Sequence, residues 1–247
     1  MKIQIAENFD QLSLHAARYV AQCMKASPTP SPLLCVASGD SPSGLYRELV
    51  REVSAGELVI SGWHFAGLDE WIGMNGADPG SCRQILDQQL LGPLRIGPDR
   101  ICFFDGRTPD QAAECARMEA YIARHGGLDV AILGLGMNGH IGLNEPGTDP
   151  DLRSHVSAIA PQTQQVGQKY FTRPVTLTQG ITLGLATLME ARHLVLVVSG
   201  SKKAEILQRG LEEPASTDLP VSQLRHHPSF TVFCDRDAAS RLHDREE

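Results

Sequence analysis

The chain has 247 residues, of which 42% are hydrophobic and 21% charged, and its formal net charge is -7 at pH 7. This length allows one large domain or two small ones, and the composition excludes a disordered, collagen-like or coiled-coil protein. Because a net negative surface repels the nucleic-acid backbone and no block of Lys and Arg with interleaved aromatic residues offsets this, we expect no nucleic-acid partner.

We expect neither a signal peptide nor a membrane span in this sequence. Residues 1–8 include no long apolar stretch, and no later apolar run approaches the ~20 residues that cross a bilayer. The six cysteines include no C-x-x-C pair, which argues against a disulfide framework and against a zinc site. We therefore expect a cytoplasmic protein with reduced, mostly buried thiols and no contact with a membrane.

Short apolar runs alternate along the chain with helix-length amphipathic segments. The runs are apolar nearly throughout, as in strands that are covered on both faces. We expect strands at residues 33–37, 63–68, 101–104, 130–133, 194–198 and 230–233, and helices at residues 9–25, 42–55, 84–91, 109–125, 201–211 and 237–243. This order predicts a single Rossmann-like α/β domain over residues 1–247, with a doubly wound, mainly parallel sheet and helices on both faces. Ligands of such sheets bind beyond the carboxyl ends of the strands.

The turn after the first predicted strand has the features of an anion site. Ser41 is placed to cap a helix that starts at Pro42, and free backbone N–H groups and the helix dipole converge at such a start. Gly39 and Ser41 are therefore candidate phosphate contacts, although an ordinary turn explains the pattern equally well. Asp40 argues against a phosphate unless its carboxylate points away from the loop.

Two adjacent acids, Asp69 and Glu70, leave the second predicted strand beside Trp71. One carboxylate can face a cleft while the other contacts the scaffold, and burial beside the indole would raise a carboxyl pKa toward that of a useful base. The alternative is a helix cap or a surface turn.

The strand that ends at residue 133 leads into a glycine-rich loop over residues 134–147 with a G-x-G-x-x-G spacing. The loop does not lead into a helix, and residues 152–189 contain no acid to bind a ribose, so we disfavour a dinucleotide site. What remains is His140 with Glu145 five residues later, a candidate acid/base couple, although a lone histidine is more often structural.

The acid-free stretch is itself basic, and a second phosphate-suited turn follows it. Its cationic side chains suggest a mobile lid around residues 152–175 over an anionic substrate, and a solvated polar loop is the alternative. The strand that ends at residue 198 is followed by Gly and Ser at a helix start, with Lys203 in reach of a phosphate. The cationic residues of the stretch are Arg153, His155, Lys169 and Arg173.

Together these segments resemble the glucosamine-6-phosphate deaminase and 6-phosphogluconolactonase superfamily, in order from about Ser38 to Lys203. Residues 68–71 look like the deaminases' L-D-E-[YW] element, and residues 139–146 look like their G-H-I-x-[FL]-N-E-P loop. The lactonases of the superfamily lack the N-E-P continuation of this loop. Residues 200–203 match G-S-x-K, whose lysine binds phosphate.

Two residues depart from the deaminase pattern. Asn138 stands where the deaminases usually have Asp, and Lys169 aligns with a phosphate-binding lid Arg. The Asn-Gly-His version, with the segments at residues 163–165 and 173–176, is similar to the galactosamine-6-phosphate isomerase subgroup.

The resemblance implies an isomerisation with loss of ammonia, from a 2-amino-2-deoxyhexose 6-phosphate, with galactosamine 6-phosphate favoured, to a ketohexose 6-phosphate. It requires no metal and no organic cofactor. His140 would open the sugar ring, Glu145 and Asn138 would orient and tune its imidazole, and Asp69 would move a proton between C2 and C1. The residues that would hold the phosphate are Gly39, Ser41, Lys203 and Lys169, with Arg173 a weaker candidate.

Three other functions remain open at this point. The first is glucosamine-6-phosphate deaminase, which performs the same chemistry on the C4 epimer. A 6-phosphosugar lactonase would need the histidine but not the C2 base, and a non-catalytic phosphosugar sensor would bind without turnover. The sequence does not fix the oligomeric state, and a homo-oligomer is among the alternatives.

Overall fold

The structure is a computed structural model that describes residues 1–243. Its main element is a seven-stranded sheet in which every neighbouring pair is parallel, in the order β1-β10-β9-β6-β2-β3-β5. The strands are β1 (Lys2–Ala6), β2 (Leu33–Val36), β3 (His64–Gly67), β5 (Ile101–Cys102), β6 (Val130–Gly134), β9 (His193–Val198) and β10 (Phe230–Asp235). This confirms the predicted α/β fold class.

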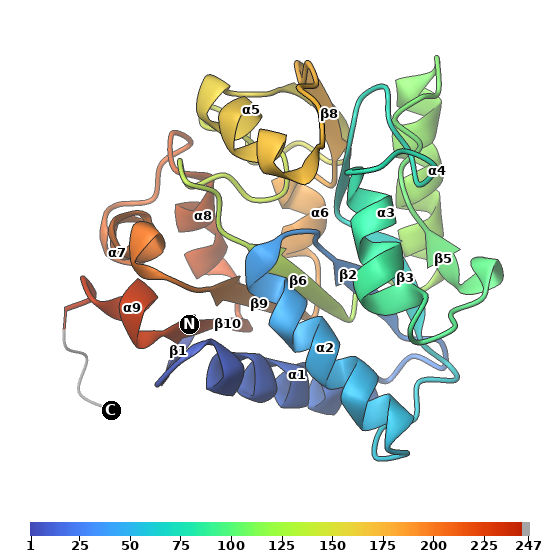
Figure 1. The fold of residues 1–247 in the computed structure, drawn as a ribbon, viewed down its shortest axis with the longest axis horizontal. Coiled ribbons are helices and arrows are strands. Elements are labelled where there is room, and N and C mark those ends of the chain that lie inside the picture. Colours follow the sequence, from blue (N-terminus) through green and yellow to red (C-terminus); the bar gives the residue numbers. More distant parts are fainter. Residues whose placement is uncertain (244–247) are drawn as a thin grey trace.

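Helices cover both faces of this sheet (Figure 1). Alternate residues of one strand enter opposite cores: Leu33 and Cys35 pack in one cluster, whereas Leu34 and Val36 pack in the other. Burial on both sides is the reason why the strands are apolar throughout. The first face holds α4 (Gln111–Arg124), α6 (Leu185–Met189), α7 (Ala204–Glu212), α8 (Pro220–Gln223) and α9 (Arg236–Ala239), and the second holds α1 (Phe9–Lys25) and α2 (Asp40–Ser54).

A second, three-stranded antiparallel sheet was not predicted. It has the order β4-β8-β7, from β4 (Asp69–Trp71), β8 (Gln179–Thr182) and β7 (His155–Ala158). Its strands have three or four residues each, too few for an alternating pattern to stand out from a loop. The edge strand β1 was missed for a related reason, because most of its side chains are exposed.

Several predicted boundaries were wrong. The strand expected at 101–104 contains only Ile101–Cys102, and the last helix covers Arg236–Ala239 instead of 237–243. The helix expected at 84–91 is α3 (Cys82–Leu86) followed by a π-helical turn, η1 (Asp87–Leu91). The remaining short elements are η2 (Pro98–Arg100), α5 (Pro161–Gly167), η3 (Gln168–Tyr170), η4 (Ser201–Lys203) and η5 (Leu224–His226).

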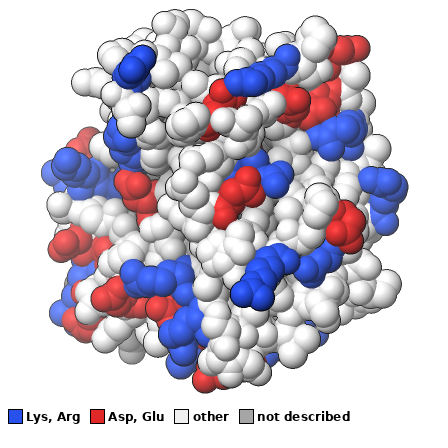
Figure 2. Space-filling view, turned by 45° about the vertical axis from the view of Figure 1, so that its right-hand side comes forward, with Lys and Arg blue, Asp and Glu red and all other residues white. Residues whose placement is uncertain are grey.

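The surface is a mixture of charges. On the face drawn in Figure 2, Lys and Arg are interspersed with Asp and Glu, without the broad basic surface on which nucleic acids bind. Within the described residues, no helix is both long and apolar enough to cross a membrane.

Candidate functional site

A cavity of about 170 Å³ lies beyond the carboxyl ends of β2 and β6. Its lining brings together residues that are far apart in the sequence, from the turn after β2, from β4, from the glycine-rich loop, from α5 and η3, and from η4. Six of the eight candidate residues line it, namely Gly39, Ser41, Asp69, His140, Lys169 and Lys203. The other two, Asn138 and Glu145, contact His140 directly.

The turn after β2 forms one wall of the cavity. The helix α2 starts at Asp40 and its N-cap is Gly39, whose φ of 130° favours glycine. The prediction that Ser41 caps this helix was wrong, because Ser41 lies inside the first turn. Its Oγ is instead 3.4 Å from Oγ of Ser199, in the turn after β9. The backbone N–H groups of this helix start remain suited to an anion.

Two lysines lie at the same wall. Nζ of Lys203 donates to the carbonyl oxygen of Leu135 over 2.5 Å, and burial, with a smaller effect of Lys169, lowers the Lys203 pKa to about 8. Nζ of Lys169 lies 2.5 Å from Oδ2 of Asp40 and 4.8 Å from the ring centre of Tyr170. Asp40 thus engages a candidate phosphate ligand instead of pointing away from it.

Asp69 enters the cavity from β4. Its residue is 9% exposed, and burial raises the pKa of the carboxyl to about 6, with a smaller opposing effect of the Cys82 thiol. Cys82 lines the same cavity from the first turn of α3. A carboxylate with this pKa is ionised at neutral pH and is a stronger base than an exposed one.

The neighbouring Glu70 contacts the scaffold, as one of the two acids was expected to do. Its Oε1 accepts from the backbone N–H of Trp71 at 2.9 Å and of Cys82 at 3.0 Å, and its Oε2 accepts from that of Arg83 at 3.0 Å. Burial outweighs these hydrogen bonds and raises the Glu70 pKa to about 7. The carboxylate therefore ties the strand that carries Asp69 to the start of α3.

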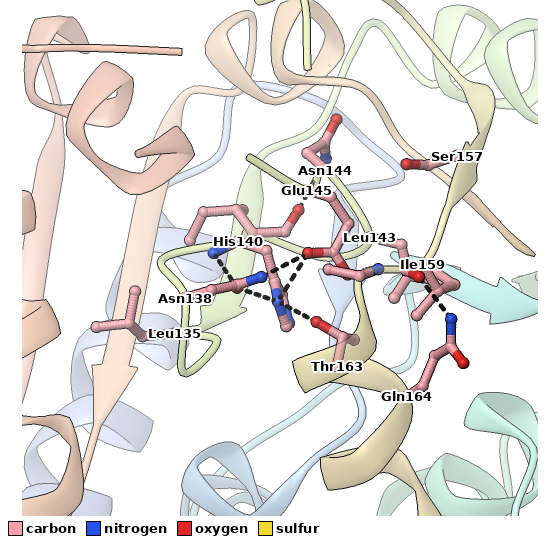
Figure 3. A network of polar contacts seen from close by, with 12 residues as sticks. Leu135, Asn138, His140, Leu143, Asn144, Glu145, Ser157, Ile159, Thr163 and Gln164 are labelled. Atoms are coloured by element: carbon pink, nitrogen blue, oxygen red, sulfur yellow. Dashed lines mark hydrogen bonds and ion pairs between the residues drawn. The ribbon is translucent and has the colours of Figure 1, made fainter. Parts of the chain in front are cut away.

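Figure 3 shows His140 next to Asn138, Glu145 and Thr163. Nδ2 of Asn138 donates to Oε2 of Glu145 over 2.7 Å, and Oδ1 of Asn138 lies 2.7 Å from Nδ1 of His140. Because Glu145 takes the amide N–H, the amide oxygen faces the ring, and Nδ1 must carry the imidazole proton. The remaining nitrogen, Nε2, is then an unprotonated base.

Asn138 therefore connects Glu145 to the imidazole. The sequence predicts that Glu145 and Asn138 each act on the imidazole, but it does not predict that Asn138 bridges the two. Oε2 of Glu145 is 3.6 Å from Nδ1 of His140, which is too long for a hydrogen bond. Burial is the largest effect on the imidazole and lowers the His140 pKa to about 4, against the opposing effect of Glu145. The ring is neutral at neutral pH.

The glycine-rich loop is required for this arrangement. A Cβ on Gly136 would lie 2.3 Å from Nδ1 of His140, so the imidazole occupies the space that any side chain at residue 136 would need. One glycine of the spacing that resembled a dinucleotide motif, Gly136, thus serves the packing of His140.

The cationic residues of the segment 152–175 do not gather at the cavity. Arg153 pairs with Glu119 and Glu190, and Nδ1 of His155 contacts the carbonyl oxygen of Arg153. Arg173 lines a separate surface hollow with its neighbours, and only Lys169 of the four reaches the cavity. The segment contributes other side chains to the lining, which were not assigned to the site from the sequence: Gln162, Thr163, Val166 and Tyr170.

Thr163, on α5, contacts the histidine directly, with Oγ1 at 3.1 Å from Nδ1 of His140. From the same segment, the backbone N–H of Ala160 donates to Oε1 of Glu145 over 3.3 Å. No set of three or more His, Cys, Asp or Glu side chains is grouped for a metal ion in the part of the chain that the structure describes.

The family described as glucosamine-6-phosphate isomerases/6-phosphogluconolactonase matches residues 7–233. Among curated proteins, a glucosamine-6-phosphate deaminase of Geobacillus sp. (strain WCH70) is 36% identical over 245 residues, which are 99% of this chain and 97% of the relative. A putative deaminase, AgaI, of Escherichia coli (strain K12) is 37% identical over 229 residues, or 92% of this chain and 89% of the relative.

Solved structures give the same grouping. A structure described as a monomeric glucosamine-6-phosphate deaminase has a TM-score of 0.93 at 34% identity and covers 98% of this chain and 100% of its own. The 6-phosphogluconolactonase of Trypanosoma brucei has a TM-score of 0.76 at 21% identity, with 98% of both chains covered, and shares the fold.

Proposed function

Because the chain belongs to the family of glucosamine-6-phosphate isomerases and 6-phosphogluconolactonases, we propose that it is an amino-sugar-phosphate deaminase that isomerises its substrate. The reaction converts a 2-amino-2-deoxyhexose 6-phosphate and water to a ketohexose 6-phosphate and ammonia. The observation that carries the proposal is the presence of Asp69, a buried base, and His140 in the lining of one cavity.

The preferred substrate on this proposal is glucosamine 6-phosphate, because the relatives above that are at least 30% identical and name a substrate are glucosamine-6-phosphate deaminases. The galactosamine preference expected from the Asn-Gly-His version of the loop stays a prediction, as does the cytoplasmic location. No contact in the cavity can be assigned to the C4 hydroxyl, whose orientation distinguishes the two sugars.

The phosphate binds at the wall that holds Gly39, Ser41, Lys169 and Lys203. The start of α2 supplies free backbone N–H groups and the positive end of the helix dipole, and the two ammonium groups supply charge. Binding at this wall places the opposite end of the sugar toward the remaining lining residues, which include Asp69 and His140.

Ring opening is the first chemical step. Nε2 of His140 is the free nitrogen, so it takes the proton of the anomeric hydroxyl and returns one to the ring oxygen, and the bond between C1 and the ring oxygen breaks. Asn138 holds the imidazole in this tautomer, and Glu145 stabilises the imidazolium that forms during the transfer.

Asp69 then carries a proton from C2 to C1. The electrons of the C2–H bond form a C1–C2 double bond, and the ammonium group at C2 loses a proton as the oxygen at C1 gains one. Return of the proton from Asp69 to C1 gives an iminium at C2. Water adds to C2 and ammonia leaves, so atoms and charge balance.

A lactonase is the main alternative, and it explains less of the cavity. Hydrolysis of a 6-phosphosugar lactone needs the histidine, but it does not need a base beside C2 such as Asp69. Residues 144–146 also form the N-E-P element through which the chain resembles the deaminases.

The test is product analysis with three compounds in parallel: glucosamine 6-phosphate, galactosamine 6-phosphate and 6-phosphogluconolactone. We expect ammonia and ketohexose 6-phosphate in equal amounts, faster from glucosamine 6-phosphate. Lactone hydrolysis without ammonia would identify a lactonase, and tight binding without turnover would identify a sensor. Faster ammonia release from galactosamine 6-phosphate would reverse the choice of epimer alone.

A further inference from the structure

The anion-binding wall of the cavity already contains an anion that belongs to the chain. Asp40 is the first residue of α2, directly after the N-cap Gly39, and it lines the cavity. Its Oδ2 lies 2.5 Å from Nζ of Lys169, which comes from η3. The carboxylate of Asp40 thus occupies an ammonium group that the wall offers to a phosphate, at the start of a helix whose dipole favours an anion.

The ion pair is placed so that it can be exchanged. The side chain of Asp40 is 75% exposed and that of Lys169 is 43% exposed, and ion pairs with such access to water are weak. Lys169 keeps a second contact when the carboxylate leaves, because its Nζ also lies over the ring of Tyr170. A dianionic phosphate offers the ammonium more charge than a carboxylate does.

On the basis of the proposed function, we propose that Asp40 competes with the substrate phosphate for Lys169. Binding of a phosphosugar then replaces the Asp40–Lys169 ion pair by a phosphate–Lys169 pair. Asp40 therefore lowers the affinity of the site for phosphate and raises KM, because it occupies the ammonium group that the phosphate needs.

The test compares wild type with Asp40→Asn, Lys169→Ala and the double variant. Two quantities are measured for each: KM for glucosamine 6-phosphate, and the Kd of inorganic phosphate by calorimetry. Asp40→Asn keeps the shape but removes the charge, so both constants should fall by about two- to fivefold. In the Lys169→Ala background the same substitution should change them by less than about twofold, because the shared partner is absent.

Asp10→Asn is the matched control. Asp10 also forms an exposed ion pair, with Arg47 at 2.8 Å, but it does not line the cavity, so the same change of net charge should leave both constants unchanged. Unchanged or higher constants in Asp40→Asn would overturn the proposal, since Asp40 would then be neutral or would hold Lys169 in place. An equal fall in both backgrounds would also overturn it, because competition for Lys169 would not be the cause.

The phosphate titration separates this proposal from the proposed function. Absence of ammonia release from every amino sugar phosphate would refute the deaminase, whereas the Kd of inorganic phosphate would still decide the role of Asp40. Conversely, if the protein is an active deaminase but the Kd of inorganic phosphate is unchanged in Asp40→Asn, the competition by Asp40 is refuted and the proposed function stands.

Discussion

Asp69 combines a raised pKa with burial, and both properties have a consequence for stability as well as for turnover. Asp69→Asn removes the base and should lower kcat by about 100-fold or more. Because burial raises the Asp69 pKa in the folded protein to about 6, the folded protein holds this proton more tightly than the unfolded protein does. The free energy of unfolding therefore falls as pH rises from about 4 through about 6. Asparagine removes this penalty, so the variant should be more stable at pH 8, by about 1–3 kcal/mol.

Denaturant titration and ammonia release on the same preparation check this prediction. At pH 3 the Asp69 carboxyl of the wild type is protonated in both the folded and the unfolded protein, so the stability gain of the variant should disappear. Near wild-type turnover in Asp69→Asn would contradict the assignment of the base.

The pKa of His140 should respond to the two residues behind it. Asn138→Asp adds an anion beside Nδ1 and should raise the His140 pKa, which moves the corresponding limb of the pH–rate profile to higher pH. Glu145→Gln removes the opposing charge and should move that limb to lower pH, with slower ring opening. A pH–rate profile of kcat/KM measures both shifts, and two folded variants without any shift would refute the chain from Glu145 to His140.

Lys203 should make substrate affinity depend on pH. Its pKa is about 8, so the ammonium loses its charge, and with it its attraction for phosphate, as pH rises above that value. KM should therefore rise between about pH 8 and 9.5 in wild type. Lys203→Arg should abolish this rise, because a guanidinium stays charged throughout. A wild-type KM that is constant over this range would remove Lys203 from the phosphate site.

At the residue scale, the motifs predicted which side chains meet but not how they contact each other. Asp69, His140 and Lys203 each follow a strand of the parallel sheet, and the carboxyl ends of such strands meet at one edge. The bridge through Asn138 and the pairing of Asp40 with Lys169 depend on side-chain positions that spacing does not encode. Arg153 and Arg173 were misjudged because local composition does not say which way a loop turns.

At the scale of elements, Glu70 fixes β4 against α3. Glu70→Gln keeps the size of the side chain but turns an accepting oxygen into an N–H donor that faces a backbone N–H. We expect a loss of about 1–3 kcal/mol of stability together with a lower kcat, because Asp69 is the adjacent residue.

The pH–rate profile distinguishes a Glu70 that positions Asp69 for catalysis from a Glu70 that only stabilises the fold. Because burial raises the Asp69 pKa to about 6, a Gln variant that lets Asp69 move toward water should shift the acid limb of kcat to lower pH. Reduced stability with an unmoved limb would leave Glu70 only a structural role.

The elements that the sequence predicted are those with long apolar or amphipathic patterns. α1 starts and ends where its 17-residue pattern does, with the Asn8 side chain accepting from the N–H of Gln11. The strands β4, β7 and β8 are held by pairing with segments more than 20 residues away and have no pattern of their own. Position along the chain could not reveal that pairing, and Thr163 reaches His140 only as a result of it.

At the scale of the whole molecule, the two-sided burial of the parallel sheet explains both the success of the fold prediction and the place of the cavity. Helices cover both faces of the sheet and leave only the strand ends open, so the candidate site residues lie at the carboxyl edge of the sheet. The oligomeric state stays a prediction, although the relative with a TM-score of 0.93 is described as monomeric.

The most direct measurement follows a deuterium label at C2 of glucosamine 6-phosphate through the reaction in ordinary water. Transfer by a single carboxylate predicts that C2 loses its deuterium in step with ammonia release and that part of the label appears at C1 of the ketohexose 6-phosphate. Asp69→Asn should suppress both the ammonia and the loss of label. A wild-type enzyme that turns over its phosphosugar while deuterium remains at C2, with no ammonia formed, would contradict the isomerising deaminase.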